Sequence, residues 1–352
     1  MPMTFDYHPM SLIASGQVMN NVEKIKIQPY YVPALPMIIT DEDIKSNDDL
    51  REYLMNRGDI YESTIGYEKR QNVIAKLHQI VVDWAISVGK TKNISDDGCS
   101  NGGGIRLKIF GSTRLDVHTP DADIDLLCIA PTFITRSDFF TSFTTLMSSR
   151  DDVSMLSGIP EAYTPVIKFN IDGLSIDMIF VSIDHSPIPD NFDVLDNRNL
   201  MQLDEQGVRS LNGVRVAECL RLLVPNFDNF CTALRFVKFW AKQRGIYSNV
   251  LGFLGGVNYA ILVAYICQRF PTASPSIIIK RFFQIFSIWQ WPTPVLLTAI
   301  DQDNENSLRK FPIWNPELNI KDAQHIMPII TPAYPAMNSA YNVGLPQFRL
   351  LR

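Results

Sequence analysis

The sequence predicts an α+β fold in which a mixed sheet, covered by helices, is followed by a mainly helical part. Three observations lead to this prediction. Helical and strand-like patterns alternate up to about residue 185, apolar helical patterns dominate from residue 205, and a polar, irregular stretch separates the two. The length of 352 residues suits two or three domains.

The N-terminal segments contain the first helical patterns. Residues 1–39 include five prolines and little periodicity, so we expect an extended arm. Residues 40–58 have acidic helix starts and end at Gly58, which predicts one or two short helices. The segment at residues 66–90 predicts an amphipathic helix, and Gly89 is expected to lie just past the helix end. Its apolar side chains recur every 3.6 residues: Ile74, Leu77, Val81, Trp84 and Val88.

The strand-like patterns follow a loop at residues 92–104. Residues 105–112 predict a strand that runs into a Gly-Ser turn, and residues 124–130 predict a strand that Pro131 ends. Two alternating runs around Asp172-Gly173 predict a β-hairpin over residues 165–182. Between these strands, residues 136–149 predict a helix with Ser137 as its N-cap.

Four apolar segments predict helices in the second half: residues 205–224, 226–245, 252–270 and 274–291. After residue 292 we expect a proline-rich loop. The most apolar window, residues 255–268, is too short to span a bilayer and is better interpreted as a buried helix. We therefore expect no membrane contact.

Composition excludes several classes of protein. The formal net charge of −5 argues against a broad polyanion binder, so any contact with nucleic acid must use a local basic groove. The five cysteines form no CxxC pair and no zinc-like spacing, which suits a reducing compartment. The N-terminus has no signal-peptide pattern.

Two aspartates interrupt the apolar run at residues 123–130. Asp123 and Asp125 are two positions apart, so on a strand they share one face, and each raises the pKa of the other. A divalent cation would relieve this repulsion. Asp177 similarly interrupts the second hairpin strand, and an antiparallel neighbour would bring it beside the first pair.

The Gly-Ser turn that precedes these aspartates adds a second feature. Backbone N–H groups at such a turn can hold phosphate oxygens. Carboxylates for Mg²⁺ together with a phosphate cradle are typical of metal-assisted nucleotidyl transfer. Two aspartates at this spacing are also common in solvated loops and caps, and Asp121 is interpreted as such a loop residue.

Several long segments carry a family resemblance: "FGSTRLDVHTPDADIDLLCIAP", "SLNGVRV", "KFWAKQRGIYSNVLGFLGGVNYAILVA", "FFQIFSIWQWPTPVLL" and "MPIITPAYPAMNSAYNV". Together they resemble the eukaryotic nuclear poly(A) polymerases, of the polymerase-beta-like nucleotidyltransferase superfamily. The resemblance covers roughly residues 25–345. It implies a nucleotidyltransferase sheet domain at residues 66–200. It also implies a helical middle domain at residues 1–65 and 201–345, with the N-terminal arm packed on it. Residues 346–352 are expected to be a tail, without the RNA-binding domain with which the family continues.

The resemblance implies roles position by position. The metal-binding and catalytic positions are Asp123, Asp125 and Asp177, which would hold two Mg²⁺ or Mn²⁺ ions. The positions implied to bind ATP, besides these aspartates, are Phe110, Gly111, Ser112, Thr119, Ile124, Lys238, Tyr247, Asn249, Gly256 and Val257. The positions implied to bind RNA are Tyr163, Lys168 and Asn212.

Several residues also have structural interpretations. Lys238 and Tyr247 lie in apolar surroundings, where a lysine often extends to the surface and a tyrosine often packs in the core. His118 is interpreted as a hydrogen-bonded structural histidine rather than a metal ligand. We expect Lys242 and Arg244 at the surface. The aromatic stripe of Phe282, Phe283, Phe286 and Trp289 is interpreted as core rather than as a platform for bases.

Three positions depart from the family pattern, which usually has an aromatic residue at Thr113, glycine at Asp116 and phenylalanine at Tyr163. We expect Asp116 to add negative charge near the catalytic aspartates.

The resemblance implies template-independent addition of AMP from ATP to RNA 3′ ends, in polyadenylation of messenger RNA in the nucleus. The implied partners are an RNA 3′ end, ATP and 3′-processing factors, and we expect a monomer. Two alternatives stay open. One is a uridylyl- or other terminal nucleotidyltransferase of the same superfamily, and the other is a non-catalytic RNA-binding or scaffold subunit.

Overall fold

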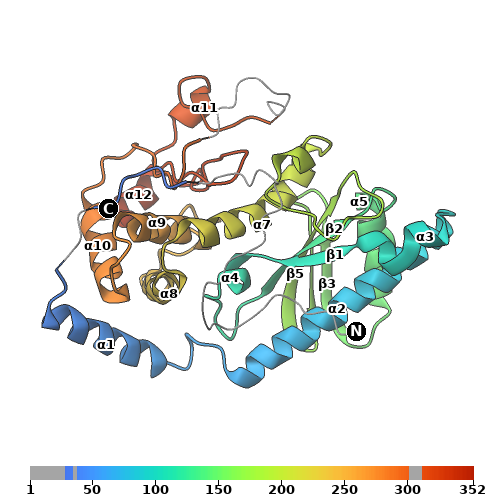
Figure 1. The fold of residues 1–352 in the computed structure, drawn as a ribbon, viewed down its shortest axis with the longest axis horizontal. Helices are drawn as coiled ribbons and strands as arrows, with labels where there is room; N and C mark the ends of the chain where they lie inside the picture. The colour runs from blue at the N-terminus through green and yellow to red at the C-terminus, as the bar shows by residue number, and fades with distance from the viewer. Residues whose placement is uncertain (1–27, 35–37, 301–310) are drawn as a thin grey trace, which may run out of the picture.

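The computed structural model describes residues 28–34, 38–300 and 311–352. A five-stranded mixed sheet lies beside a helical part, and the long helix α2 runs along the sheet (Figure 1). This is the α+β architecture that the sequence predicts. Most of the arm expected at residues 1–39 lies outside the described residues. Its described piece pairs with the helical part, because Tyr30 N–H donates to Leu297 O at 3.0 Å and Ala34 N–H to Arg269 O at 2.8 Å.

The strand order of the sheet is β1-β2-β5-β4-β3. The strands are β1 (Arg106–Ile109), β2 (Ile124–Ala130), β3 (Val153–Ile159), β4 (Val166–Ile171) and β5 (Leu174–Ser182). The predicted strands and the hairpin are confirmed, with Asp172 and Gly173 at φ 50° and 76° in its turn. β3 was not predicted, because most of its residues are exposed and show no apolar alternation. The expectation of an antiparallel neighbour for β2 was wrong, since β5 pairs with β2 in parallel.

One face of the sheet packs against α2 (Thr64–Thr91) and the helical turns α5 (Arg136–Asp138), η2 (Phe139–Phe143) and α6 (Thr144–Ser148). The five apolar positions predicted for α2 are all buried. The predicted end at Gly89 was wrong, because the helix continues to Thr91 and Cys99 Sγ occupies the space of the missing Cβ. The N-cap of α5 is Thr135 rather than Ser137, and its hydroxyl accepts from Asp138 N–H.

Short elements connect these layers. The helix predicted for residues 40–58 is the single helix α1 (Asp41–Met55), with a capping box between Thr40 and Asp43. The predicted loop at residues 92–104 contains α3 (Asp96–Cys99) and η1 (Ser100–Gly104). A turn of helix, α4 (Gly111–Arg114), follows β1, and η3 (Asn197–Leu200) precedes the helical part.

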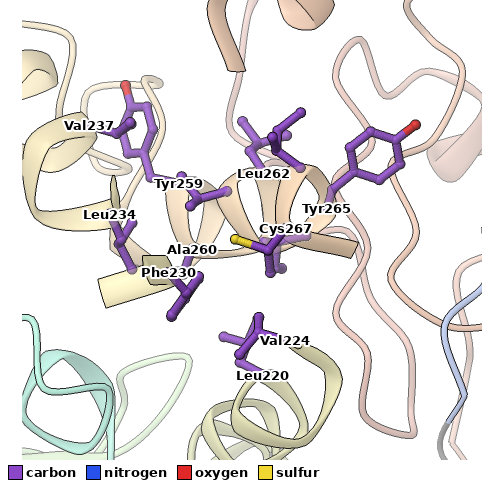
Figure 2. Close-up of a cluster of buried hydrophobic side chains, with 14 of the residues drawn as sticks. Leu220, Val224, Phe230, Leu234, Val237, Tyr259, Ala260, Leu262, Tyr265 and Cys267 are labelled. Carbon is purple, nitrogen blue, oxygen red and sulfur yellow. The ribbon is translucent and has the colours of Figure 1, made fainter. Parts of the chain in front are cut away.

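Four helices form the helical part, as predicted: α7 (Glu205–Leu223), α8 (Phe227–Gln243), α9 (Gly256–Arg269) and α10 (Pro275–Ser287). α9 is buried from Asn258 to Gln268, and side chains of α7 and α8 point toward it in Figure 2. α7 also covers the second face of the sheet, where Leu127 and Ile179 pack against Leu211. None of the described helices is long and apolar enough to cross a membrane.

The described residues after 292 are mostly loop, as predicted, with two short helices. These are α11 (Ile320–Ala323) and α12 (Leu345–Leu351), so the predicted tail is largely helical. The aromatic stripe of α10 packs on the helical core, which confirms its core interpretation. Phe282, Phe283 and Phe286 also line an apolar cavity of about 560 Å³ beside α12.

Candidate active site

Three carboxylates meet at the start of two parallel strands. Asp125 on β2 lies directly opposite Asp177 on β5, and Asp123 immediately precedes β2. Each of the three can offer an oxygen that lies within 4.8 Å of the other two. Oxygen ligands at this spacing suit a hard divalent cation such as Mg²⁺ or Mn²⁺. The residues present therefore fit a metal site.

The electrostatics of this cluster also favour a cation. Burial, together with the charges of Asp123 and Asp177, raises the pKa of the Asp125 carboxyl to about 7. Burial and the charge of Asp177 raise the pKa of Asp123 as well. Lys168 on β4 lies opposite Asp177 in the sheet and forms an ion pair with it. Among the described residues, the ammonium groups of Lys168 and Lys238 lower the pKa of Asp125 without offsetting this rise, so the three carboxylates leave room for further positive charge.

The Gly-Ser turn packs directly against the acidic cluster. Gly111 adopts φ +62°, and a Cβ at this position would lie 2.1 Å from Asp125 Oδ2. Both the backbone conformation and the space therefore require glycine. Phe110 N–H donates to Asp125 O at 3.0 Å. Arg114 at the end of the turn forms a bidentate ion pair with Glu218 of α7, at 2.6 and 2.9 Å.

A cavity of about 750 Å³ opens between the sheet and the helical part. Ten of the residues implied to bind ATP line it: Phe110, Gly111, Ser112, Thr119, Asp123, Asp125, Lys238, Tyr247, Gly256 and Val257. Asn212, implied to bind RNA, lines it too. The cavity thus has Asp123, Asp125 and the Gly-Ser turn at one side and the helices α7, α8 and α9 at the other.

The remaining implied residues lie outside the cavity lining. Ile124 is fully buried on the sheet face that packs against α2, so its side chain points away from the cavity. Asp177, Lys168 and Tyr163 lie beside the cavity on the β4–β5 side. Asn249 supports the wall from behind, because its Nδ2 donates to Ser339 O at 3.3 Å and its Oδ1 accepts from Asn342 at 2.7 Å.

Lys238 is a buried ammonium in the cavity wall. Its side chain lies on α8, and Nζ donates to Val117 O at 2.9 Å. Burial, together with the neighbouring charges of Lys242 and Arg235, lowers the pKa of this lysine to about 8. A cation held out of water in this way attracts anionic groups strongly. The interpretation of Lys238 as a lysine extended to the surface is wrong.

Tyr247 forms the wall next to α9. Its ring stacks on Tyr259 at 5.7 Å between centroids. A Cβ on Gly256 would lie 2.8 Å from the Tyr247 hydroxyl, so glycine lets the ring approach the start of α9. Lys242 Nζ lies 5.7 Å from the centre of the same ring. Lys242 and Arg244 are both exposed, as predicted, and Lys242 also lines the cavity.

His118 and Asp116, the two polar residues that the sequence singled out near the turn, both contact residues outside the acidic cluster. His118 is buried edge-on to Tyr67, and burial lowers its pKa to about 4. Its two ring nitrogens have no hydrogen-bond partner within the described residues, so it is a neutral structural histidine without the expected hydrogen bond. Asp116 adopts φ +52°, a conformation that favours glycine, and its carboxylate pairs with Arg235 at 3.2 Å.

The sequence did not point to Arg70, which holds the loop that leads into Asp123 and β2. Arg70 is buried on α2, and its Nε donates to Glu62 at 2.8 Å. Its Nη2 donates to three carbonyls of the loop before β2: Thr119 at 3.3 Å, Pro120 at 3.0 Å and Ala122 at 2.8 Å. The signal available was weak, since an arginine on an amphipathic helix is ordinarily solvated.

Among the residues that line the cavity, the polar side chains of Ser175, Arg209 and Thr331 were also not predicted. Arg209 on α7 places its guanidinium 4.1 Å from the centre of the Tyr163 ring. The side-chain oxygen of Asn212, one turn further along α7, is buried and has no hydrogen-bond partner within the described residues. This face of α7 therefore presents a cation and a free acceptor at the edge of the cavity.

Comparison with known families gives two matches. A model described as the poly(A) polymerase nucleotidyltransferase domain matches residues 38–224, and one described as the poly(A) polymerase central domain matches residues 229–351. Nuclear poly(A) polymerases 2 and 4 of Arabidopsis thaliana are 44% and 43% identical to this chain over 88% of its length. The chain spans only 38% and 41% of the length of these two relatives.

Solved structures with the same fold are more distant in sequence. The Cid1 poly(U) polymerase superposes with a TM-score of 0.55 at 12% identity, covering 89% of this chain and 92% of that one. A cytoplasmic RNA terminal U-transferase gives 0.55 at 14% identity, covering 88% and 90%. These likenesses show a shared nucleotidyltransferase fold with a helical second part.

Proposed function

Because the chain belongs to the poly(A) polymerase family, we propose that it adds AMP from ATP to the 3′ end of RNA without a template. The observation that carries this proposal is the acidic cluster of Asp123, Asp125 and Asp177 at a cavity whose opposite wall holds the buried ammonium of Lys238. The nuclear relatives favour a role in nuclear polyadenylation of messenger RNA. We propose that the chain acts there as a monomer, together with 3′-processing factors.

In this proposal the three aspartates hold two Mg²⁺ or Mn²⁺ ions. Asp123, Asp125 and Asp177 would each offer a carboxylate oxygen to these ions, and Asp177 lies on the side from which we expect the RNA end. Divalent ions bound there supply charge that activates a 3′-hydroxyl and stabilises a leaving pyrophosphate. The raised pKa of Asp125 supports this assignment, since a buried carboxylate needs a cation.

The triphosphate of ATP lies between the Gly-Ser turn and α8. Ser112 and the backbone of Gly111 face one side of the cavity and Lys238 faces the other, so both can contact phosphate oxygens. Thr119 contributes from the loop that Arg70 holds. Tyr247, Gly256 and Val257 enclose the adenosine. Asn249 and Ile124 act indirectly: Asn249 holds the cavity wall in place, and Ile124 anchors the backbone between Asp123 and Asp125.

The RNA end approaches from the β4–β5 side. Lys168 is exposed there beside Asp177, and Tyr163 is half exposed at the entrance to β4. Asn212 contributes its free oxygen from α7. Few cations are available on this side, so the contacts involve only the last nucleotides.

Primer extension tests the proposal. The chain is incubated with an oligo(A) primer, each of the four nucleoside triphosphates in turn, and Mg²⁺ or Mn²⁺. We expect extension with ATP that outcompetes UTP, CTP and GTP, and no extension after chelation. Preferred extension with UTP would identify a uridylyltransferase instead. RNA binding without any extension would identify a non-catalytic subunit.

A further inference from the structure

Two tyrosine rings from distant parts of the chain meet next to Arg209, which lines the cavity. Tyr163 precedes β4, and Tyr341 lies on a turn before α12. Their ring centres are 6.5 Å apart and their planes are inclined by 41°. Tyr163 is 53% exposed and Tyr341 50%, so about half of the surface of each residue is open to solvent. Neither ring lines the 750 Å³ cavity, and neither is used in the contacts with ATP proposed above.

The turn that carries Tyr341 is held firmly. Its neighbours Ala340 and Val343 are buried in the helical core. Asn342 Nδ2 donates to Asn249 Oδ1 at 2.7 Å. The hydroxyl of Ser339, the residue before Ala340, accepts a hydrogen bond from Asn258 Nδ2 at 2.7 Å. These contacts fix the turn that carries the exposed Tyr341. The same turn contacts Asn249, which supports the cavity wall proposed to bind ATP.

The other ring is also fixed, and it lies next to positive charge. The guanidinium of Arg209 lies 4.1 Å from the centre of the Tyr163 ring, and its Nη1 donates to Tyr163 O at 3.4 Å. Five residues after Tyr163, Lys168 forms its ion pair with Asp177. A guanidinium plane and two aromatic rings are thus in contact in series, and the strand that follows Tyr163 carries Lys168 to Asp177.

From these contacts we infer that Tyr341, together with Tyr163, binds a nucleobase of the RNA strand by stacking, close to its 3′ end. Unpaired bases bind to proteins chiefly by stacking on aromatic rings and arginine planes. The ring pair offers two such surfaces, one from each part of the molecule. Stacking there holds the strand while its 3′-hydroxyl lies at Asp177. The inference rests on the proposed function, because it assigns the site to the RNA substrate.

A simpler role for the pair is to brace the sheet against the helical part. Aromatic pairs at centroid distances of 4.5–7 Å attract each other without any ligand. The two roles give different results when Tyr341 is changed. A brace affects thermal stability alone, whereas a base-binding ring affects RNA binding and leaves ATP binding unchanged.

Oligo(A) primers with 2-aminopurine at one of the last three positions provide the test. Stacking quenches the fluorescence of this base, so titration with the chain in the absence of ATP reports the contact directly. We expect quenching with the wild type and with Tyr341→Phe, which keeps the ring. We expect Tyr341→Ala to lose the quenching at one position. Because one stacked base contributes about 1–3 kcal/mol, its KM for primer should rise roughly tenfold while its KM for ATP stays unchanged.

The matched control is Tyr53→Ala. Tyr53 is similarly exposed on α1, where its ring lies edge-on to Phe239, away from the acidic cluster. This variant should quench and extend primers like the wild type. If Tyr341→Ala binds and extends the primer as the wild type does, the stacking inference is overturned and the proposed function stands. If the wild type extends no primer with any nucleotide, the proposed function itself fails.

Discussion

Asp125 on β2 and Asp177 on β5 lie directly opposite each other in two neighbouring parallel strands. Between them in the sequence lie β3 and β4. These two strands form one side of the sheet, and β5 lies in its centre, between β4 and β2. Because parallel strands place equivalent ends together, the two carboxylates meet at one edge with Asp123 beside them. The sheet topology thus assembles a cation site from residues that carry like charge.

We expect Asp125→Asn to abolish nucleotide addition without unfolding the protein. An amide keeps the shape of the carboxylate but removes the charge that holds a cation, and loss of one such group costs at least about 10²–10³ in rate. Burial of the charged form raises the pKa of Asp125, so the amide should leave the melting temperature of the metal-free protein unchanged or higher. Primer extension and thermal unfolding at pH 8 measure the two effects.

The matched control is Asp151→Asn, at an exposed position. It should leave both the extension rate and the melting temperature unchanged. An Asp125→Asn variant that extends primers at a near-normal rate would remove Asp125 from the metal site.

We expect Gly111→Ala to impair the enzyme through the same carboxylate. The added Cβ would lie 2.1 Å from Asp125 Oδ2, and φ +62° is unfavourable for alanine. Displacement of Asp125 by about 1 Å should lower kcat about 10²-fold. Steady-state kinetics measure the change. Gly58→Ala is the control, because a Cβ there meets nothing within 4 Å. If the two substitutions changed kcat equally, the close contact between residue 111 and Asp125 would not affect catalysis.

Local patterns made much of this site predictable. The apolar run at residues 124–130 with Asp125 inside it predicted β2, and the Asp172-Gly173 turn predicted the hairpin that carries Asp177. The Gly-Ser turn was also visible, since Gly111 needs a conformation that few other residues adopt. In each case the signal lies within a few residues of the feature that it predicts.

The features that were missed depend on contacts between distant segments. The pairing of β2 with β5 is parallel because two further strands intervene, and one of these, β3, has no apolar alternation that would reveal it. Arg70 reaches a loop about fifty residues away, and Tyr341 meets Tyr163 only in the folded molecule. Such side chains resemble ordinary surface residues until the fold places them.

We expect the use of ATP to depend on pH through Lys238. Burial lowers the pKa of this ammonium to about 8, so it is charged below pH 8 and neutral above it. Since the charged form attracts the triphosphate, kcat/KM for ATP should fall as pH rises through about 8. Lys238→Arg keeps its charge over this range, so its profile should stay level up to pH 9.5. Kinetics between pH 6.5 and 9.5 give both profiles, and a parallel decline in the variant would assign the titration to another group.

Finally, we expect the buried pair of Arg70 and Glu62 to stabilise the protein by holding the loop before β2. Loss of one partner from a buried ion pair typically costs about 3–5 kcal/mol, because the other charge is left without a partner. Arg70→Met should lose more stability than Glu62→Gln, since Arg70 also donates to the carbonyls of Thr119, Pro120 and Ala122. Urea unfolding of both variants and of the double variant measures the coupling.

The double variant separates the ion pair from the loop contacts. The two single losses should not add, and the coupling energy should be about 0.5–3 kcal/mol, as for residues in contact. Glu62→Gln keeps the donors of Arg70 on the loop, so it should retain a near-normal KM for ATP, whereas Arg70→Met frees Thr119 and should raise that KM. Additive losses of stability would show that the two side chains act independently. An unchanged KM in Arg70→Met would show that the loop before β2 keeps its place without the arginine.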